Sequence, residues 1–227
     1  MQWRPSDASD RRADRLQGFL QAKAHTLSEV FPLTATDGAA SGFVLSSLGD
    51  GKPILWVQDR MSQVESGQPY LPGFPARRQI LYLTLPRAVD VLWTMEEGLR
   101  CAALGAVIGE VWGTPPALDF TASRRLATRA EANGIPCWLI RRAATPDLSA
   151  ARNRWRIASL PALAHPHDPQ APGDPRWQVE LFRARQAQPG TWVAAHDRAA
   201  DRVDFSAPFR DGAVAETDGA DIRRATG

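Results

Sequence analysis

Residues 31–49, FPLTATDGAASGFVLSSLG, begin at the end of a short strand-like run, continue through a loop and end in an apolar helix-like run. This is where an α/β protein carries a phosphate-binding loop. A loop of the GxxxxGK[ST] type holds phosphate with backbone N–H groups, a lysine and a hydroxyl that binds Mg²⁺. Here Pro32 stands at the first glycine of that pattern, and Gly38 stands at the second with one extra residue between them. Ala39 and Ala40 occupy the positions of the lysine and the hydroxyl.

With these residues the loop lacks the groups that bind phosphate and Mg²⁺. The two alanines supply neither the positive charge nor the metal ligand, and Pro32 has no backbone N–H. Asp37 adds a negative charge that repels phosphate. The sequence therefore predicts a degenerate phosphate loop in a protein that is not an enzyme, with no catalytic residue, no cofactor and no metal. Weak nucleotide binding without hydrolysis remains the lesser alternative.

Two further groups of residues have types that can carry chemistry, but their surroundings argue against a site. Asp59 and Glu110 each end an apolar strand-like run. We expect Asp59 at a capped turn and Glu110 in a structural hydrogen bond. The HPHD segment at 165–168 lies in a proline-rich loop without a further ligand cluster, so it predicts no metal site.

The order of apolar runs and turn residues predicts a single α/β domain in this 227-residue chain. Buried strands alternate with amphipathic helices, which is typical of parallel βαβ units and of a mostly parallel central sheet with helices on both faces. The expected strands are 28–31, 52–58, 79–85, 105–111 and 135–141, and the expected helices are 39–48, 87–104 and 119–134.

After residue 142 the pattern changes, because polar and apolar residues alternate with no helix between the runs. This alternation predicts an antiparallel C-terminal extension of the sheet after residue 153. Its expected strands are 153–160, 176–185, 190–197 and 201–206. The segment 60–78 is rich in glycine and proline and is expected to be irregular.

The chain is expected to have three parts. An amphipathic N-terminal helix places Leu16, Phe19 and Leu20 on one face. The parts are this helix (1–24), the α/β core without a functional phosphate loop (25–209), and a C-terminal tail (210–227) that is too polar to fold alone and is expected to be disordered.

The sequence also predicts where in the cell the protein is located. No stretch reaches the roughly 18 apolar residues that a membrane span needs, and the first residues lack the apolar middle of a secretory signal. Cys101 and Cys137 have neither zinc-site nor disulfide-scaffold spacing, so both are expected to be small core residues. We therefore expect a cytoplasmic protein with no membrane partner.

Several longer phrases of the sequence resemble the ImuA family of damage-inducible bacterial mutagenesis proteins. These are MEEGLR (95–100) before GAVIGEV, DFTASRRL (119–126), and RWQVELFRAR followed by GTWVAAHD. The resemblance covers roughly residues 25–206. It implies a shortened, RecA-like core that is non-catalytic and acts in SOS-induced translesion DNA synthesis. The partners it implies are an ImuB-like, polymerase-family adaptor, an error-prone replicative polymerase and RecA.

The RecA-like fold implied by this resemblance also indicates where DNA would bind. Its two DNA-contacting loops correspond here to 112–120 and 141–156. Arginines with an interleaved aromatic residue suit phosphate contact and base stacking on single-stranded DNA. The alternative is that these arginines face solvent along an edge strand. The candidates are Arg124, Arg125, Arg129, Arg141, Arg142, Arg152, Arg154, Trp155 and Arg156.

Three functions stay open from the sequence. The first is an adaptor that contacts a protein partner or a second copy through Leu16, Phe19 and Leu20, with the alternative that this helix folds back on its own sheet. The second is a single-stranded DNA-binding module of the same fold. The third is an SOS-induced inhibitor of cell division, because short degenerate RecA-like chains resemble that family as well.

Overall fold

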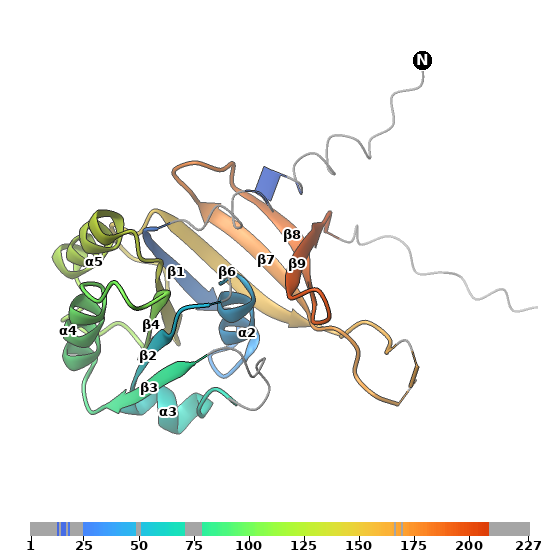
Figure 1. The fold of residues 1–227 in the computed structure, drawn as a ribbon, viewed down its shortest axis with the longest axis horizontal. Helices are drawn as coiled ribbons and strands as arrows, with labels where there is room; N and C mark the ends of the chain where they lie inside the picture. Colours follow the sequence, from blue (N-terminus) through green and yellow to red (C-terminus); the bar gives the residue numbers. More distant parts are fainter. Residues whose placement is uncertain are drawn as a thin grey trace, which may run out of the picture.

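A nine-stranded mixed sheet organises the molecule in the computed structural model (Figure 1). The structure describes residues 25–208 apart from 49–50, 71–78, 166 and 169, together with residues 13, 15, 16 and 18. The strands are β1 (Leu27–Pro32), β2 (Ile54–Asp59), β3 (Ile80–Leu85), β4 (Ala106–Trp112), β5 (Cys137–Arg142), β6 (Asn153–Leu160), β7 (Arg176–Arg183), β8 (Gly190–Asp197) and β9 (Arg202–Ser206). The helices are α2 (Ala39–Ser46), α3 (Arg60–Ser66), α4 (Ala88–Gly98) and α5 (Phe120–Asn133).

The strand order is β3-β2-β4-β5-β1-β6-β7-β8-β9. The strands from β3 to β6 are parallel to their neighbours, and β7, β8 and β9 continue the sheet in antiparallel pairs. β6 is the junction, because it pairs parallel with β1 and antiparallel with β7. The predicted mostly parallel sheet with an antiparallel C-terminal extension is therefore confirmed.

Side chains from the two faces of the sheet form two separate cores. On one face, α2 packs Phe43 against Trp138, Trp155 and Trp177. On the other face, buried residues of α4 and α5 pack on alternate residues of β2, β4 and β5. Figure 1 shows α4 and α5 together on one side of the sheet, with β7, β8 and β9 extending away from them. Helices thus cover both faces of the parallel half, as expected.

Two local predictions were wrong. The segment expected to be irregular contains α3, which the carboxylate of Asp59 caps by accepting a 2.7 Å hydrogen bond from the Ser62 amide. This helix has only seven residues, so its sequence shows no helical periodicity. The glycines and prolines that follow it favoured the prediction of an irregular segment. Cys137 is buried as expected, but Cys101 is exposed because it lies in the turn after α4 rather than in the helix predicted over 87–104.

The described part of the N-terminal segment packs on the protein itself. Ala13 and Leu16 are buried in the same core cluster as Phe43. The prediction that Leu16 contacts a partner is therefore corrected, because its side chain is already covered within the chain. Phe19, Leu20 and the tail 210–227 lie outside the described residues, and the division of the chain into three parts stays a prediction.

None of the helices in the described ranges has the length and hydropathy needed to cross a membrane. The longest of them, α5, has 14 residues and carries three arginines. The expected cytoplasmic location stays a prediction.

A glycine sets the distance between α4 and the sheet. A Cβ atom at Gly109 in β4 would lie 2.1 Å from Sδ of Met95, which is fully buried in α4. We expect Gly109→Ala to lower the free energy of unfolding by about 1–3 kcal/mol, because the methyl group overpacks this contact. Urea unfolding followed by tryptophan fluorescence measures the change.

Gly38→Ala is the matched control, because nothing lies within 4 Å of a Cβ at that position and the backbone φ is −70°. Its stability should stay the same or rise slightly. An unchanged unfolding midpoint for Gly109→Ala would contradict this prediction, because it would show that the space between α4 and β4 can hold a methyl group.

Candidate functional site

The predicted phosphate loop lies between β1 and α2, at the carboxyl end of the sheet. Its strand ends at Pro32, which lies opposite Ile157 of β6, and its helix begins at Ala39. Ala39 and Ala40, the first two residues of α2, are buried in the core. The two positions that matter most for phosphate chemistry therefore contribute packing rather than charge.

Arg142, at the end of β5, occupies the concave side of this loop with its guanidinium. Nη1 donates hydrogen bonds to the carbonyl oxygens of Ala35 (2.8 Å) and Asp37 (3.0 Å), and Nη2 donates to Oγ of Ser41 (3.1 Å). A phosphate-binding loop directs its N–H groups toward the ligand. Here the loop directs carbonyl oxygens toward a cation, which is the opposite polarity.

Glu110, at the end of the neighbouring strand β4, neutralises this arginine. Its Oε1 forms an ion pair with Nε of Arg142, and both side chains are almost fully buried. Nε1 of Trp56 donates to the other carboxylate oxygen at 3.3 Å. The prediction of a structural hydrogen bond for Glu110 is thus confirmed, although its main partner is a buried charge.

Asp37 supplies the negative charge at the start of α2. One carboxylate oxygen accepts a hydrogen bond from the Ala39 amide (2.8 Å) and from Oγ of Ser159 (2.6 Å), and the other accepts from the Ser159 amide (2.8 Å). Burial raises the pKa of Asp37, but these hydrogen bonds and the charge of Arg142 outweigh it, so the pKa lies below its usual value.

Asp59 completes this end of the sheet. Besides capping α3, its second carboxylate oxygen accepts a 3.0 Å hydrogen bond from the Trp112 amide, and the side chain is buried. A carboxylate that accepts two backbone N–H bonds is committed to positioning those segments and is not placed to activate water. The expected role of Asp59 at a capped turn is confirmed.

The charged side chains at this end of the sheet, Arg142, Glu110, Asp37 and Asp59, are satisfied by partners within the chain. A buried anion pairs with the guanidinium of Arg142, and the anion position at the start of α2 is taken by Asp37. Each charge of the loop therefore has its partner within the chain. The arrangement can fix the loop against β4, β5 and β6, and it offers no unmatched cation to a phosphate group.

The DNA prediction is corrected for four residues. Arg141, Arg142, Arg154 and Trp155 are at most 5% exposed, so their side chains lie inside the protein. Arg141 and Arg154 both pair with Glu29 of β1 (3.6 and 2.7 Å). Buried charges need such partners, and the sequence did not reveal that β1 would supply one.

The other candidates are divided between three places. Arg125 and Arg129 pair with Glu96 of α4 (2.9 and 3.4 Å), and Arg156 pairs with Glu180 of β7 at 2.9 Å. Arg124 and Arg152 line a groove beside α5. The same groove is lined by Arg183, Arg185 and Phe120, which were not among the residues predicted from the sequence. The RxR spacing at the end of RWQVELFRAR could have indicated the two arginines.

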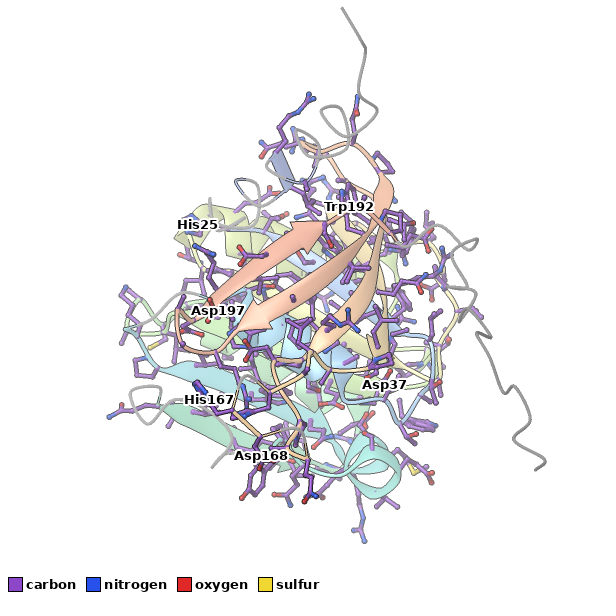
Figure 2. The ribbon with its side chains drawn as sticks, turned by 90° about the vertical axis from the view of Figure 1, so that its right-hand side faces the viewer. His25, Asp37, His167, Asp168, Trp192 and Asp197 are labelled. Carbon is purple, nitrogen blue, oxygen red and sulfur yellow. The ribbon has the colours of Figure 1, made fainter. Side chains whose placement is uncertain are left out.

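The HPHD segment forms no metal centre within the described ranges, where no group of three or more histidine, cysteine or acidic side chains is arranged to hold an ion. His167 and Asp168 lie on the long connection between β6 and β7 (Figure 2). Their polar side-chain contacts are local: His165 Nδ1 accepts from the His167 amide, and Asp168 accepts from the Gln170 amide.

Comparison with known proteins gives relatives of one kind. The chain is 35% identical over 153 residues to "Protein ImuA" of Caulobacter vibrioides strain NA1000 / CB15N, and equally to "Protein ImuA" of strain ATCC 19089 / CIP 103742 / CB 15. The match covers 63% of this chain and spans 60% of the length of these curated relatives. No protein-family model matches the chain. The comparison confirms the resemblance to ImuA proteins.

The ion pair between Arg142 and Glu110 should dominate the stability of this end of the sheet. We expect Arg142→Met to lower the free energy of unfolding by about 3–5 kcal/mol, because it leaves the carboxylate of Glu110 buried without its cation. The double variant Arg142→Met/Glu110→Gln should be more stable than Arg142→Met alone. Urea unfolding of Arg142→Met, Glu110→Gln and the double variant gives the coupling energy, and strict additivity of the two single changes would contradict the pair.

The low pKa of Asp37 predicts a pH-dependent contribution to stability. A carboxyl whose pKa is lowered on folding stabilises the protein above its unfolded-state pKa of about 4, and this contribution is lost as the pH falls through the folded-state value. We expect Asp37→Asn to be less stable than the parent near neutral pH, with the difference shrinking below about pH 4. Urea unfolding across this range measures it.

Glu65→Gln, which removes an exposed carboxyl on α3, controls for the loss of one negative charge. A difference between parent and Asp37→Asn that stays constant down to pH 3 would show that the hydrogen bonds to Asp37 do not depend on its charge.

Proposed function

We propose that this chain is a non-catalytic accessory protein of damage-induced translesion DNA synthesis, of the ImuA type. The two Caulobacter relatives carry the name ImuA, and the sequence phrases that resemble this family lie within the core of the fold. The role is that of a mutasome component that acts through contacts with other proteins.

The position of Arg142 carries the non-catalytic part of the proposal. A phosphoryl-transfer site needs a positive charge and donors that are free for the substrate. In this chain the guanidinium in the loop already has carbonyl, hydroxyl and carboxylate partners, and the first amide of α2 binds Asp37. Binding of a nucleotide phosphate would have to break these interactions and bring a second anion beside Asp37 and Glu110.

The topology supports a degenerate RecA-like core. A loop joins β1 to a buried helix, acidic side chains end β2 and β4, and the strand order requires crossovers between parallel neighbours. These are the features expected of an ancestral nucleotide site at the carboxyl ends of parallel strands. Asp59 and Glu110 would then be survivors of that site which now cap α3 and neutralise Arg142.

A protein without a catalytic site acts through the proteins that it binds. We propose an ImuB-type, polymerase-family adaptor as the main partner and RecA as a second one. Because Leu16 is buried in the protein's own core, the contact would use Phe19 and Leu20 of the same N-terminal segment.

The purified full chain tests the proposal in one set of measurements. We expect no MgATP turnover above background, and co-purification with an ImuB-type adaptor of the same organism. Phe19→Ser/Leu20→Ser should abolish this co-purification with an almost unchanged melting temperature. Leu16→Ser is the contrasting variant and should lower the melting temperature, because it places a hydroxyl in a buried apolar site.

Two results would overturn the proposal. The first is ATP turnover that a substitution within 32–42 abolishes in a folded protein, which would show that the loop does chemistry. The second is full retention of adaptor binding by Phe19→Ser/Leu20→Ser together with a large loss of stability, which would place these side chains in the protein's own core.

A further inference from the structure

A positively charged groove lies between α5 and the segments that flank β6 and β7. It has a volume of about 580 Å³, and its described lining contains four arginines and no carboxylate. Arg124 comes from α5, Arg152 from the residue before β6, and Arg183 and Arg185 from the end of β7. Three separate segments of the chain thus direct the same charge into one hollow.

The charges in this groove are poorly neutralised. Arg124 is exposed and has no hydrogen bond or ion pair with another described residue, and Arg183 makes only a 3.4 Å contact with the carbonyl oxygen of Ser149. Arg152 pairs with Glu131 at 2.7 Å. This hydrogen bond lowers the pKa of Glu131 despite its partial burial, and the charge of Arg185 acts in the same direction. One carboxylate beside the groove therefore faces two arginines, Arg152 and Arg185.

Four exposed arginines outside the groove are arranged differently, although Arg60 is also exposed and makes no ion pair with another described residue. Each of four examples pairs with a nearby carboxylate, which leaves little net charge at its position. The pairs are Arg87 with Asp90, Arg100 with Glu97, Arg198 with Asp174 and Arg202 with Asp204. The groove differs from these positions because its described lining holds four arginines and no carboxylate, and Glu131, from outside the lining, pairs with Arg152 alone.

The groove adjoins a second hollow. This hollow of about 230 Å³, lined by His25, Thr26 and Glu131, shares Arg152 and Arg185 with the groove. The two hollows together run from α5 to the residues just before β1, and Glu131 is the one carboxylate in their described linings. A chain of several anionic groups would use this length, whereas a single small anion would contact only part of it.

An aromatic ring lies among the charges. Phe120, the first residue of α5, lines the groove and is 44% exposed. An exposed ring beside arginines provides a stacking surface for a base, while the guanidiniums contact phosphates.

We propose that this groove binds the phosphodiester backbone of a single-stranded nucleic acid, with Arg124, Arg183 and Arg185 contacting phosphates and Phe120 stacking on a base. The groove is separate from the loop that Arg142 fills, so the proposal does not depend on the absence of catalysis. It replaces the DNA surface expected from the sequence, most of whose arginines are buried or paired.

Fluorescence anisotropy with a labelled oligo(dT) tests this on the full chain. Binding should weaken steeply with salt, and Arg124→Ala/Arg183→Ala/Arg185→Ala should weaken it about tenfold or more and reduce the salt slope by roughly 2, at about 0.7 for each single-strand phosphate contact. Phe120→Ala should weaken binding about tenfold with the slope unchanged, because stacking releases no counterions.

Arg87→Ala/Arg100→Ala/Arg198→Ala is the matched control, because it removes three exposed positive charges outside the groove. It should leave the affinity within about twofold of the parent. Oligo(U) measured beside oligo(dT) identifies whether RNA or DNA is the preferred source of the backbone, and either preference supports the groove.

Three outcomes would overturn the proposal. One is an absence of oligonucleotide binding by the parent at low salt. Another is an equal loss of binding in the two triple variants, which would make the effect one of net charge. The third is displacement of oligo(dT) by polyglutamate of equal charge and concentration, which would identify the groove as a surface for acidic proteins.

Discussion

The buried contact between Arg142 and Glu110 determines the structure of the carboxyl end of the sheet. A guanidinium inside a protein must have almost all its donors satisfied, because an unpaired buried charge costs several kcal/mol. Glu110 satisfies one side of it, and the loop satisfies the other by turning the carbonyl groups of Ala35 and Asp37 inward. The conformation of the loop thus follows from the cation it surrounds, and this conformation is the reverse of one that binds phosphate.

A second buried group of charges joins the two halves of the sheet. Glu29 of β1 lies between Arg141 of β5 and Arg154 of β6, and the ring of Phe31 packs under both guanidiniums at 5.6 and 5.3 Å. The side chain of Asp147 pairs with Arg141 at 3.2 Å. Because β6 is the strand where parallel pairing changes to antiparallel, these charges fix its position beside β1 and thereby the register of the extension.

Much of the fold could be predicted from the sequence, because strands and helices leave local patterns. Alternating βαβ runs gave all five parallel strands through β5, and polar–apolar alternation gave the extension. The site could not be predicted in the same way. Arg154 in the run RNRWR has the pattern of a solvent-facing residue, and its burial depends on Glu29, which is 125 residues away in the sequence. Only the strand order brings such partners together, and no local pattern encodes it.

Apart from exposed arginines that pair with a nearby carboxylate, such as Arg87 with Asp90, the strand order distinguishes two classes of arginine. Where β1 or β4 places a carboxylate opposite, as Glu29 and Glu110 do, the arginine is buried and its charge is used within the fold. Where a wall carries no carboxylate, as around Arg124 and Arg183, the charge stays exposed and its field extends into solvent. Residue type is the same in both classes, and the neighbouring strand decides which arginines hold the protein together and which remain able to bind an anion.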